Sequence, residues 1–268
     1  MKRKSRAQWM IRTWCLLLCL PAVYATAGPA KQVYTIGVQD FSDYLPYSQV
    51  KKGSYTGFNR ELLDRFAASQ GYLFIYKPRP IKRLYMEFMA GEFDFKYPDN
   101  PYWSASFKKS RKVTIRYSDP VVKYIDGVMV RSDKQGSDIN QLHTLGVVAG
   151  FTPFLYLPRI QSGAITQQDV PSYERLLQLV ILGRLDGAYS NISVSRYYLD
   201  KILDKKGALV FNPSMPYTQS YRYLSSIQHP EIIEKFNQFL FQNRQRLQKL
   251  KDKYGVEAGV TISDTIDK

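Results

Sequence analysis

One short pattern occurs twice in the chain and limits the possible folds more than any other feature. The sequence GEFD at residues 91–94 ends a segment with apolar residues at helical spacing, and GRLD at residues 183–186 does the same. The spacing predicts a helix that stops at the glycine, and the apolar run that follows predicts a strand, which in the first copy covers Phe93–Phe95. Two copies of one helix–turn–strand unit predict two similar α/β lobes.

The segments around the two copies continue this alternation. Strands and helices alternate along residues 33–95 and again along residues 124–213, an order that favours α/β layers with a largely parallel sheet. The segment 96–109 is predicted to be a loop. One long helix is predicted over residues 230–255, because its apolar residues form a single stripe and Gly255 ends it.

A cleaved secretory signal is predicted for residues 1–27. Five basic residues lead into the apolar run WCLLLCLPAV, and small residues precede Gly28, which is the pattern of an export signal. Cys15 and Cys19 both lie in this segment, so the exported chain has neither a disulfide nor a thiolate metal site. No later segment has the roughly 20 apolar residues of a membrane helix. The sequence therefore predicts a protein released into the periplasm.

The charge and the few histidines exclude other classes of protein. Removal of five of the 38 basic residues leaves a net charge of +10 against the 23 acids. The basic residues are dispersed, which argues against a nucleic-acid partner. His143 and His229 stand apart without the spacing of zinc ligands, and no nucleotide-binding or serine-hydrolase motif occurs. Neither a metal nor a cofactor is predicted, and the chain is not predicted to be an enzyme.

Three collinear stretches resemble the family-3 extracytoplasmic solute-binding proteins, which include the amino-acid receptors of ABC importers. They are YTGFNRELLDRFA at residues 55–67, RKVTIRYSDPVV at residues 111–122, and LGVVAGFT with LLQLVILGRLDGAYSN within residues 145–191. Their order and spacing extend the resemblance over nearly all of residues 33–256.

The resemblance implies a two-lobed, periplasmic-binding-protein-like type II α/β fold with two hinge strands. Lobe 1 would comprise residues 31–122 and 214–268, and lobe 2 would comprise residues 123–213. A small molecule would bind in the cleft between the lobes, which would close around it by hinge bending.

The resemblance also implies that Arg111 holds a ligand carboxylate. The family places an arginine seven residues before the serine of Ser-x-Pro, and Arg111 stands seven residues before Ser118. A guanidinium suits this role because it offers two parallel donors and stays charged. The alternative is that Arg111 belongs to a solvated basic loop with Lys108, Lys109 and Lys112.

Two residues of the second lobe match family positions that contact ligand. Thr152 lies in a glycine loop whose hydroxyl and N–H groups can hold the same carboxylate, although it can equally be an ordinary loop threonine. Asn191 stands five residues after Asp186, where amino-acid receptors carry an aspartate for the ligand ammonium group. Because a neutral amide cannot balance a buried cation, an anionic ligand is predicted rather than an α-amino acid, unless Asp169 or Asp126 compensates.

Aromatic residues and one further arginine complete the predicted site. Tyr44 matches a tyrosine that stacks on ligand in the family, and Tyr97 and Trp103 lie in the unusual loop 96–109. Aromatic faces suit planar ligands, although most aromatic residues in such a chain belong to the core. Arg83 is a candidate from its Pro-x-x-Arg context and can equally form a surface salt bridge.

These expectations define the predicted function. The protein is expected to act as a monomer that captures a small, carboxylate-bearing solute for the permease of an ABC importer or for a membrane sensor protein. The alternative is an enzyme on the same fold, a lyase similar to cyclohexadienyl dehydratases.

Overall fold

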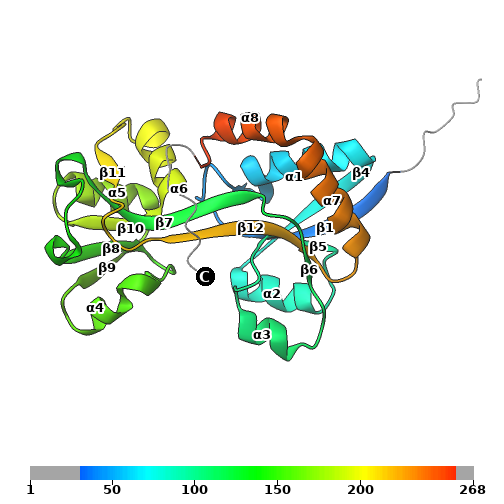
Figure 1. Cartoon of the computed structure of the whole chain (residues 1–268), viewed down its shortest axis with the longest axis horizontal. Helices are drawn as coiled ribbons and strands as arrows, with labels where there is room; N and C mark the ends of the chain where they lie inside the picture. The colour runs from blue at the N-terminus through cyan, green and yellow to red at the C-terminus, as the bar shows by residue number, and fades with distance from the viewer. Residues whose placement is uncertain (1–30, 258–268) are drawn as a thin grey trace, which may run out of the picture. The chain divides into compact units, whose positions relative to one another are not determined.

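The computed structural model describes residues 31–257, so the predicted signal segment lies outside the described residues (Figure 1). The strands are β1 (Gln32–Gln39), β2 (Gln49–Lys51), β3 (Ser54–Thr56), β4 (Tyr72–Arg79), β5 (Phe95–Asp99), β6 (Arg116–Tyr117), β7 (Val122–Arg131), β8 (Thr144–Val148), β9 (Thr166–Val170), β10 (Gly187–Asn191), β11 (Leu209–Phe211) and β12 (Thr218–Ser226). The helices are α1 (Phe58–Gln70), α2 (Ile81–Met89), α3 (Ala105–Ser110), α4 (Leu157–Gln161), α5 (Tyr173–Ile181), α6 (Ile192–Tyr197), α7 (Pro230–Gln242) and α8 (Arg244–Tyr254). Among the described residues, no helix is long and apolar enough to cross a membrane.

Most of the strands form one mixed sheet with the order β4-β1-β5-β12-β7-β10-β8-β9. Pairing is parallel on both sides of β1 and on both sides of β8, as the alternation of strands and helices predicts. The two long strands β7 and β12 pair antiparallel with each other and join the two parallel ends (Figure 1). Each end of the sheet thus has its own α/β layer, and β7 and β12 are common to both.

The recurring Gly-x-x-Asp pattern has the same structural role at both ends of the sheet. The Asp94 carboxylate accepts hydrogen bonds from the backbone N–H and hydroxyl of Thr35 on β1, at 2.7 and 2.8 Å. The Asp186 carboxylate accepts the equivalent pair from Thr144 on β8, at 2.8 and 3.0 Å. In each half this aspartate therefore fixes the central parallel strand to the turn after the helix.

Three predicted boundaries differ from the structure. The strand after GEFD begins at Phe95 rather than Phe93, because Asp94 bonds to Thr35 through its side chain and lies outside the strand ladder. The segment 96–109 is not one loop, since its start belongs to β5 and its end to α3. The long helix over 230–255 is two helices separated at Asn243, whose side-chain N–H donates to the Phe239 carbonyl at 3.0 Å. The backbone N–H of Asn243 donates to the same carbonyl at 3.0 Å, so the side-chain bond adds to the helical bond there and does not replace it.

Helices α7 and α8 nevertheless present the predicted apolar stripe to α1. Phe66 of α1 lies 5.0 Å from Phe236 and 5.5 Å from Phe239 of α7, measured between ring centroids. At the other end of α1, the Glu61 carboxylate accepts bonds from Lys253 at 2.6 Å and Tyr254 at 2.8 Å, both on α8. The C-terminal helices are therefore fastened to α1 by an apolar contact and by a polar one.

Substitution of Glu61 by glutamine is expected to lower the thermal midpoint by about 1–3 °C at pH 7. Burial alone would raise the pKa of Glu61, but bonds from Lys253, Tyr254 and Arg65 outweigh it and lower the pKa from 4.5 to about 2. A folded-state pKa below the unfolded one means that stability is present above pH 4.5 and is lost as the pH falls from 4.5 to 2.

The measurement is a thermal unfolding series from pH 7 to pH 2 on both proteins. The difference in midpoint should shrink over the acidic window. A matched control is Glu92→Gln, because Glu92 is exposed and its side chain forms no ion pair within residues 31–257. A difference between wild type and E61Q that stays constant down to pH 2 would contradict the assignment.

Candidate functional site

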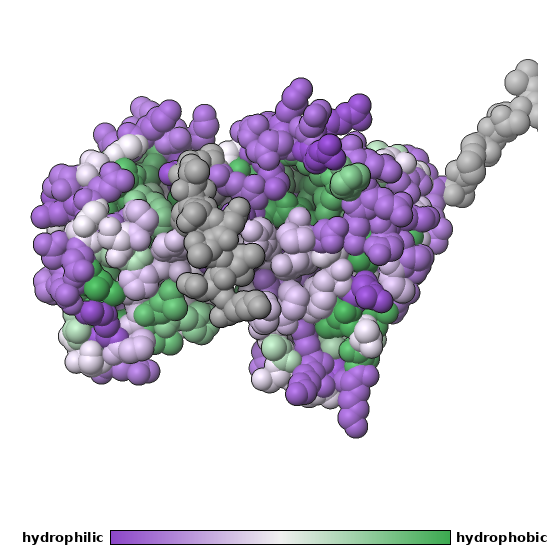
Figure 2. All heavy atoms as spheres, viewed as in Figure 1, coloured by the Kyte–Doolittle hydropathy of each residue, from purple (hydrophilic) through white to green (hydrophobic). Residues whose placement is uncertain are grey.

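A cleft of about 630 Å³ lies beside β7 and β12. Its walls come from both ends of the sheet: the segments after β1 and β5 contribute Tyr44 and Trp103, and the segments at the ends of β8 and β10 contribute Phe151 and Asn191. Figure 2 shows the surface hollowed between the region of α4 and the region of α2 and α3. A concave site between two α/β layers is the usual place for a small ligand.

One face of the β7–β12 pair forms the floor of the cleft. Alternate residues of a strand point to the same face, and the lining residues here are Tyr124 and Asp126 of β7 with Thr218, Ser220 and Arg222 of β12. Thr218 stands opposite Asp126 in the antiparallel register, and Ser220 stands opposite Tyr124. The two strands that join the halves therefore supply one carboxylate, Asp126, and one guanidinium, Arg222, to the cleft.

Arg222 is held in a fixed orientation with unused donors. Its guanidinium carbon lies 4.2 Å from the Trp103 ring centroid and 3.8 Å from that of Tyr124, so the group is sandwiched between two aromatic faces. One terminal nitrogen donates to the Ser220 hydroxyl at 2.7 Å and to the Tyr221 carbonyl at 3.3 Å. The Nε atom is buried and has no hydrogen-bond partner among the described residues. Arg222 lines the cleft, and its second terminal nitrogen forms no hydrogen bond within residues 31–257, so this nitrogen can donate to a group in the cleft.

Two buried lysines lie behind the Trp103 side of the cleft. Lys96 and Lys108 donate to the same oxygen of Asp99, at 3.0 and 2.8 Å, and Lys96 and Asp99 are fully buried. The Lys96 ammonium also lies 5.7 Å from the Trp103 ring centroid, whose other partner is Arg222. Burial lowers the pKa of Lys96 to about 8, although Asp99 acts in the opposite direction. With Arg222 included, this side of the cleft has three cations and one anion.

Asn191 and Asp126 form the polar group at the other side of the cleft. The Asn191 side-chain oxygen caps α6 by accepting from the backbone N–H groups of Ser193 and Val194, at 3.1 and 3.2 Å. Its amide nitrogen is therefore left to donate, and it donates to Asp126 Oδ1 at 3.0 Å. Burial raises the pKa of Asp126, and Arg222 and the Asn191 bond only partly offset it.

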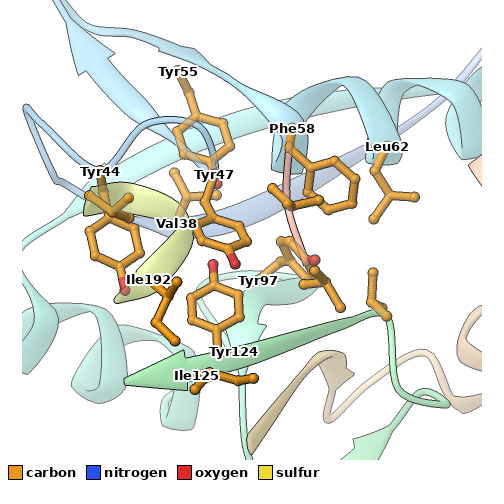
Figure 3. Close-up of a cluster of buried hydrophobic side chains, with 14 of the residues drawn as sticks. Val38, Tyr44, Tyr47, Tyr55, Phe58, Leu62, Tyr97, Tyr124, Ile125 and Ile192 are labelled. Carbon is orange, nitrogen blue, oxygen red and sulfur yellow. The ribbon is translucent and has the colours of Figure 1, made fainter. Parts of the chain in front are cut away.

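Stacked aromatic rings line the rest of the cleft. Tyr124 lines the cleft and extends from β7 toward Tyr47, a buried residue outside the lining, and their ring centroids lie 4.0 Å apart (Figure 3). Tyr44 stacks on Phe151 from the opposite half, with centroids 6.1 Å apart and an interplanar angle of 12°. Together with Trp103, these rings give the cleft flat apolar walls around the charged groups.

The structure brings four of the predicted site residues to the cleft. Tyr44, Trp103, Thr152 and Asn191 all line it, although they come from segments far apart in the sequence. Thr152 is exposed and precedes only a short helical turn. Tyr44 and Trp103 are therefore more than core residues, because both line the cleft.

Three predicted site residues lie elsewhere. Tyr97 is fully buried in the core on β5. Arg83 is an exposed residue of α2 whose guanidinium pairs with Glu87 one helical turn away. Arg111 caps the end of α3, is exposed, and lies over the Phe107 ring with its guanidinium carbon 4.6 Å from the centroid. The short helix α3 directs Lys108 inward and leaves Arg111 outside the cleft lining.

Arg222 is the cleft residue that sequence reasoning missed. The only signal for it is the order TQSYRY at residues 218–223, in which polar residues occupy every second position up to an arginine. This alternation places Thr218, Ser220 and Arg222 on one face of a strand. Without knowledge that this face borders a cavity, the same pattern is typical of a solvated strand.

The described residues offer no metal centre. Residues 31–257 contain no group of three or more histidine, cysteine, aspartate or glutamate side chains that can hold a metal ion.

Two α/β layers joined by two strands, with a cleft beside those strands, define a two-lobed solute-binding fold with two hinge strands, as the sequence predicted. The chain belongs to family 3 of the bacterial extracellular solute-binding proteins, since the sequence model of that family matches residues 35–257. No curated protein sequence matches the chain.

Solved structures share the fold at low sequence identity. The second substrate-binding domain of GlnP from Lactococcus lactis, in an open conformation, is 18% identical with a TM-score of 0.61, over 86% of this chain and 97% of that chain. An ancestral cationic amino acid solute-binding protein is 22% identical with a TM-score of 0.63, over 82% and 95%. A histidine kinase sensor domain similar to periplasmic binding proteins is 17% identical with a TM-score of 0.59, over 84% and 98%.

Proposed function

We propose that this protein captures a small, carboxylate-bearing solute in the cleft and that Arg222 holds the carboxylate. The observation that carries the proposal is the sandwiched guanidinium of Arg222, which lines the cleft, is 5% exposed and keeps one terminal nitrogen without a hydrogen-bond partner among residues 31–257. A carboxylate matches the paired donors of a guanidinium, and a charge-assisted bond of this kind is stronger than a neutral one.

The charges around Arg222 favour an anionic group at this side of the cleft. Lys96, Lys108 and Arg222 carry three positive charges, and the carboxylates near them are Asp99 and Asp126, of which burial raises the pKa of Asp126. A ligand carboxylate would offset part of this surplus. The flat walls formed by Tyr44 and Trp103 suit an apolar or planar body attached to the carboxylate.

Capture is proposed to involve closure of two lobes. Lobe 1 comprises residues 31–122 with 214–268, and lobe 2 comprises residues 123–213. Closure would bring Thr152 and Asn191 onto a ligand already bound at Arg222, as expected for hinge bending around a solute. The protein would act as a monomer in the periplasm.

The captured solute is proposed to be passed to a membrane protein. The similar structures include the substrate-binding protein of an amino acid ABC transporter and the sensor domain of a histidine kinase, so proteins with this fold serve in transport and in sensing. The partner of this chain is accordingly the permease of an ABC importer or a membrane sensor protein.

A thermal-shift screen of the purified protein, followed by calorimetry, tests the proposal. The screen compares carboxylates with their primary amides and alcohols, which keep the shape and lose the charge. A carboxylate at 100 times its dissociation constant should stabilise the protein by about 2.7 kcal/mol. The ligand should be recovered unchanged after incubation, whereas turnover would favour a lyase. Equal stabilisation by amides and carboxylates would overturn the assignment.

A further inference from the structure

Helices α2 and α3 pack against each other at one end of the molecule, beside the cleft (Figure 1). Phe107 of α3 packs on the apolar cluster that contains Leu84 of α2. The Lys108 ammonium of α3 also lies 5.4 Å from the ring centroid of Tyr85 on α2. The outward side chains of both helices, and those of the segment 111–113 that follows α3, therefore lie at the same end of the molecule.

The exposed side chains at this end are called the α2–α3 surface, and they are Lys82, Arg83, Met86, Lys109, Arg111, Lys112 and Val113. Of its five basic residues, only Arg83 forms an ion pair within residues 31–257, with Glu87. Glu92 is the only exposed acid within residues 81–113, because the other acids there are buried or half-buried and accept bonds inside the fold. The α2–α3 surface therefore carries positive charge that the described chain does not balance.

Apolar side chains lie between these basic residues. Met86 is 51% exposed and follows Lys82 by one helical turn, so the two side chains share a face of α2. Val113 is 38% exposed and directly follows Lys112. Figure 2 shows hydrophilic and hydrophobic residues side by side at this end of the molecule. Basic residues mixed with exposed apolar ones, with almost no acids, are typical of surfaces that lie on a membrane.

We propose that the α2–α3 surface binds to the anionic headgroups of a phospholipid bilayer. A lysine or arginine near an anionic membrane strengthens binding by about fivefold, and four or more of them form an effective cluster. Met86 and Val113 would enter the boundary between headgroups and acyl chains, where apolar side chains contribute to binding. The long stems of lysine and arginine suit this position, because they remain in the apolar layer while their charges reach the headgroups.

This inference goes beyond the proposed function and does not depend on which solute the cleft binds. The segment that joins β5 to α3 contributes Tyr102 and Trp103 to the cleft lining, so the cleft lies next to the α2–α3 surface. A protein bound through that surface would therefore keep its cleft near the bilayer. It would meet a membrane partner by moving along the surface instead of through the whole compartment.

Co-sedimentation of the whole exported chain with lipid vesicles tests the proposal. The vesicles contain equal parts of phosphatidylglycerol and phosphatidylcholine, or phosphatidylcholine alone. Wild type should bind the anionic vesicles about 10-fold or more tightly than the neutral ones in about 50 mM salt. Salt at about 0.5 M should remove most of this binding, because it screens the charges of both surfaces. The thermal midpoint of each variant shows whether its fold is intact.

Removal of three lysine charges from the α2–α3 surface should weaken binding to the anionic vesicles by about 100-fold, at about fivefold per charge. The variant is K82Q/K109Q/K112Q. The matched control removes the same net charge from three exposed lysines between α6 and β11, which have two exposed acids beside them. This control is K201Q/K205Q/K206Q. It should change binding by about 2-fold or less, since distant surface charges are screened.

A further variant, M86Q/V113T, keeps every charge and should weaken binding by about fivefold or more. Unchanged binding of this variant would overturn a bilayer as the partner, because charge alone would then be sufficient. Equal losses in the two lysine variants would overturn the α2–α3 surface as the site, because net charge would then account for the attraction.

Two other outcomes separate this inference from its alternatives. Failure of wild type to bind anionic vesicles would overturn it, and capture by immobilised polyglutamate instead would indicate an acidic protein partner. Failure of every carboxylate in the thermal-shift screen would overturn the proposed function and leave vesicle binding as a separate property of the chain.

Discussion

Replacement of Arg222 by glutamine is expected to weaken binding of a carboxylate solute by about 30-fold to several thousand-fold. Loss of one partner of a buried charge pair typically costs about 2–5 kcal/mol, which corresponds to that range. Glutamine keeps one donor and much of the side-chain length but cannot present two charged parallel donors. The change should appear in the dissociation constant measured by calorimetry.

Arg111→Gln is the matched control for this variant. Both substitutions remove one guanidinium, but Arg111 is exposed over Phe107 and lies outside the cleft lining. Its loss should leave the affinity within about 2-fold of wild type, as is usual for a surface position. The reverse result, with weak binding in R111Q and normal binding in R222Q, would contradict the assignment to Arg222. It would show that Arg111 holds the ligand carboxylate, as the family pattern implies.

Replacement of Asp99 by asparagine is expected to lower the free energy of unfolding by about 3–5 kcal/mol. Asp99 is fully buried and is the shared anion of Lys96 and Lys108. Its other carboxylate oxygen accepts a bond from Ser225 at 2.7 Å. An amide of the same shape can still accept one bond, but it leaves two buried ammonium groups without a countercharge. Denaturant unfolding of D99N and wild type measures the difference.

A second substitution tests whether charge is the cause. Lys96→Met should cost much less than D99N, because methionine fills a similar volume and Asp99 keeps Lys108 as its partner. In the K96M background, D99N should cost less than it does in wild type, since only one ammonium group then loses its anion. A cost of D99N that is the same in both backgrounds would contradict electrostatic coupling between Lys96 and Asp99.

Local periodicity in the sequence was sufficient to predict the layers of the fold. The two Gly-x-x-Asp copies predicted equivalent halves, and the structure gives Asp94 and Asp186 the same bond to the neighbouring strand. Breaks within an element were less predictable. The separation of α7 from α8 falls at Asn243, whose backbone and side-chain N–H groups both donate to the Phe239 carbonyl, and an asparagine within a helical stripe does not by itself predict such a break.

The site was only partly predictable, because the direction in which a side chain points depends on how its helix or strand packs against the others. Thr152 follows the end of β8 and Asn191 is the last residue of β10, and these strand ends place both residues in the cleft. Arg111 had the spacing of the family but lies at the end of a short helix that turns it outward. Arg222 and Asp126 come from opposite strands of one pair, a neighbourhood that depends on strand register and that no local pattern contains.

The sandwich around Arg222 also gives the chain an optical reporter of its own. Trp103 is the only tryptophan in residues 31–257, and its indole ring lies against the guanidinium that is proposed to hold the ligand. A solute that binds there changes the polarity and the charge next to the sole indole of the described chain. Binding of a solute in the cleft should therefore change the intrinsic tryptophan fluorescence, so that binding can be followed without an added label.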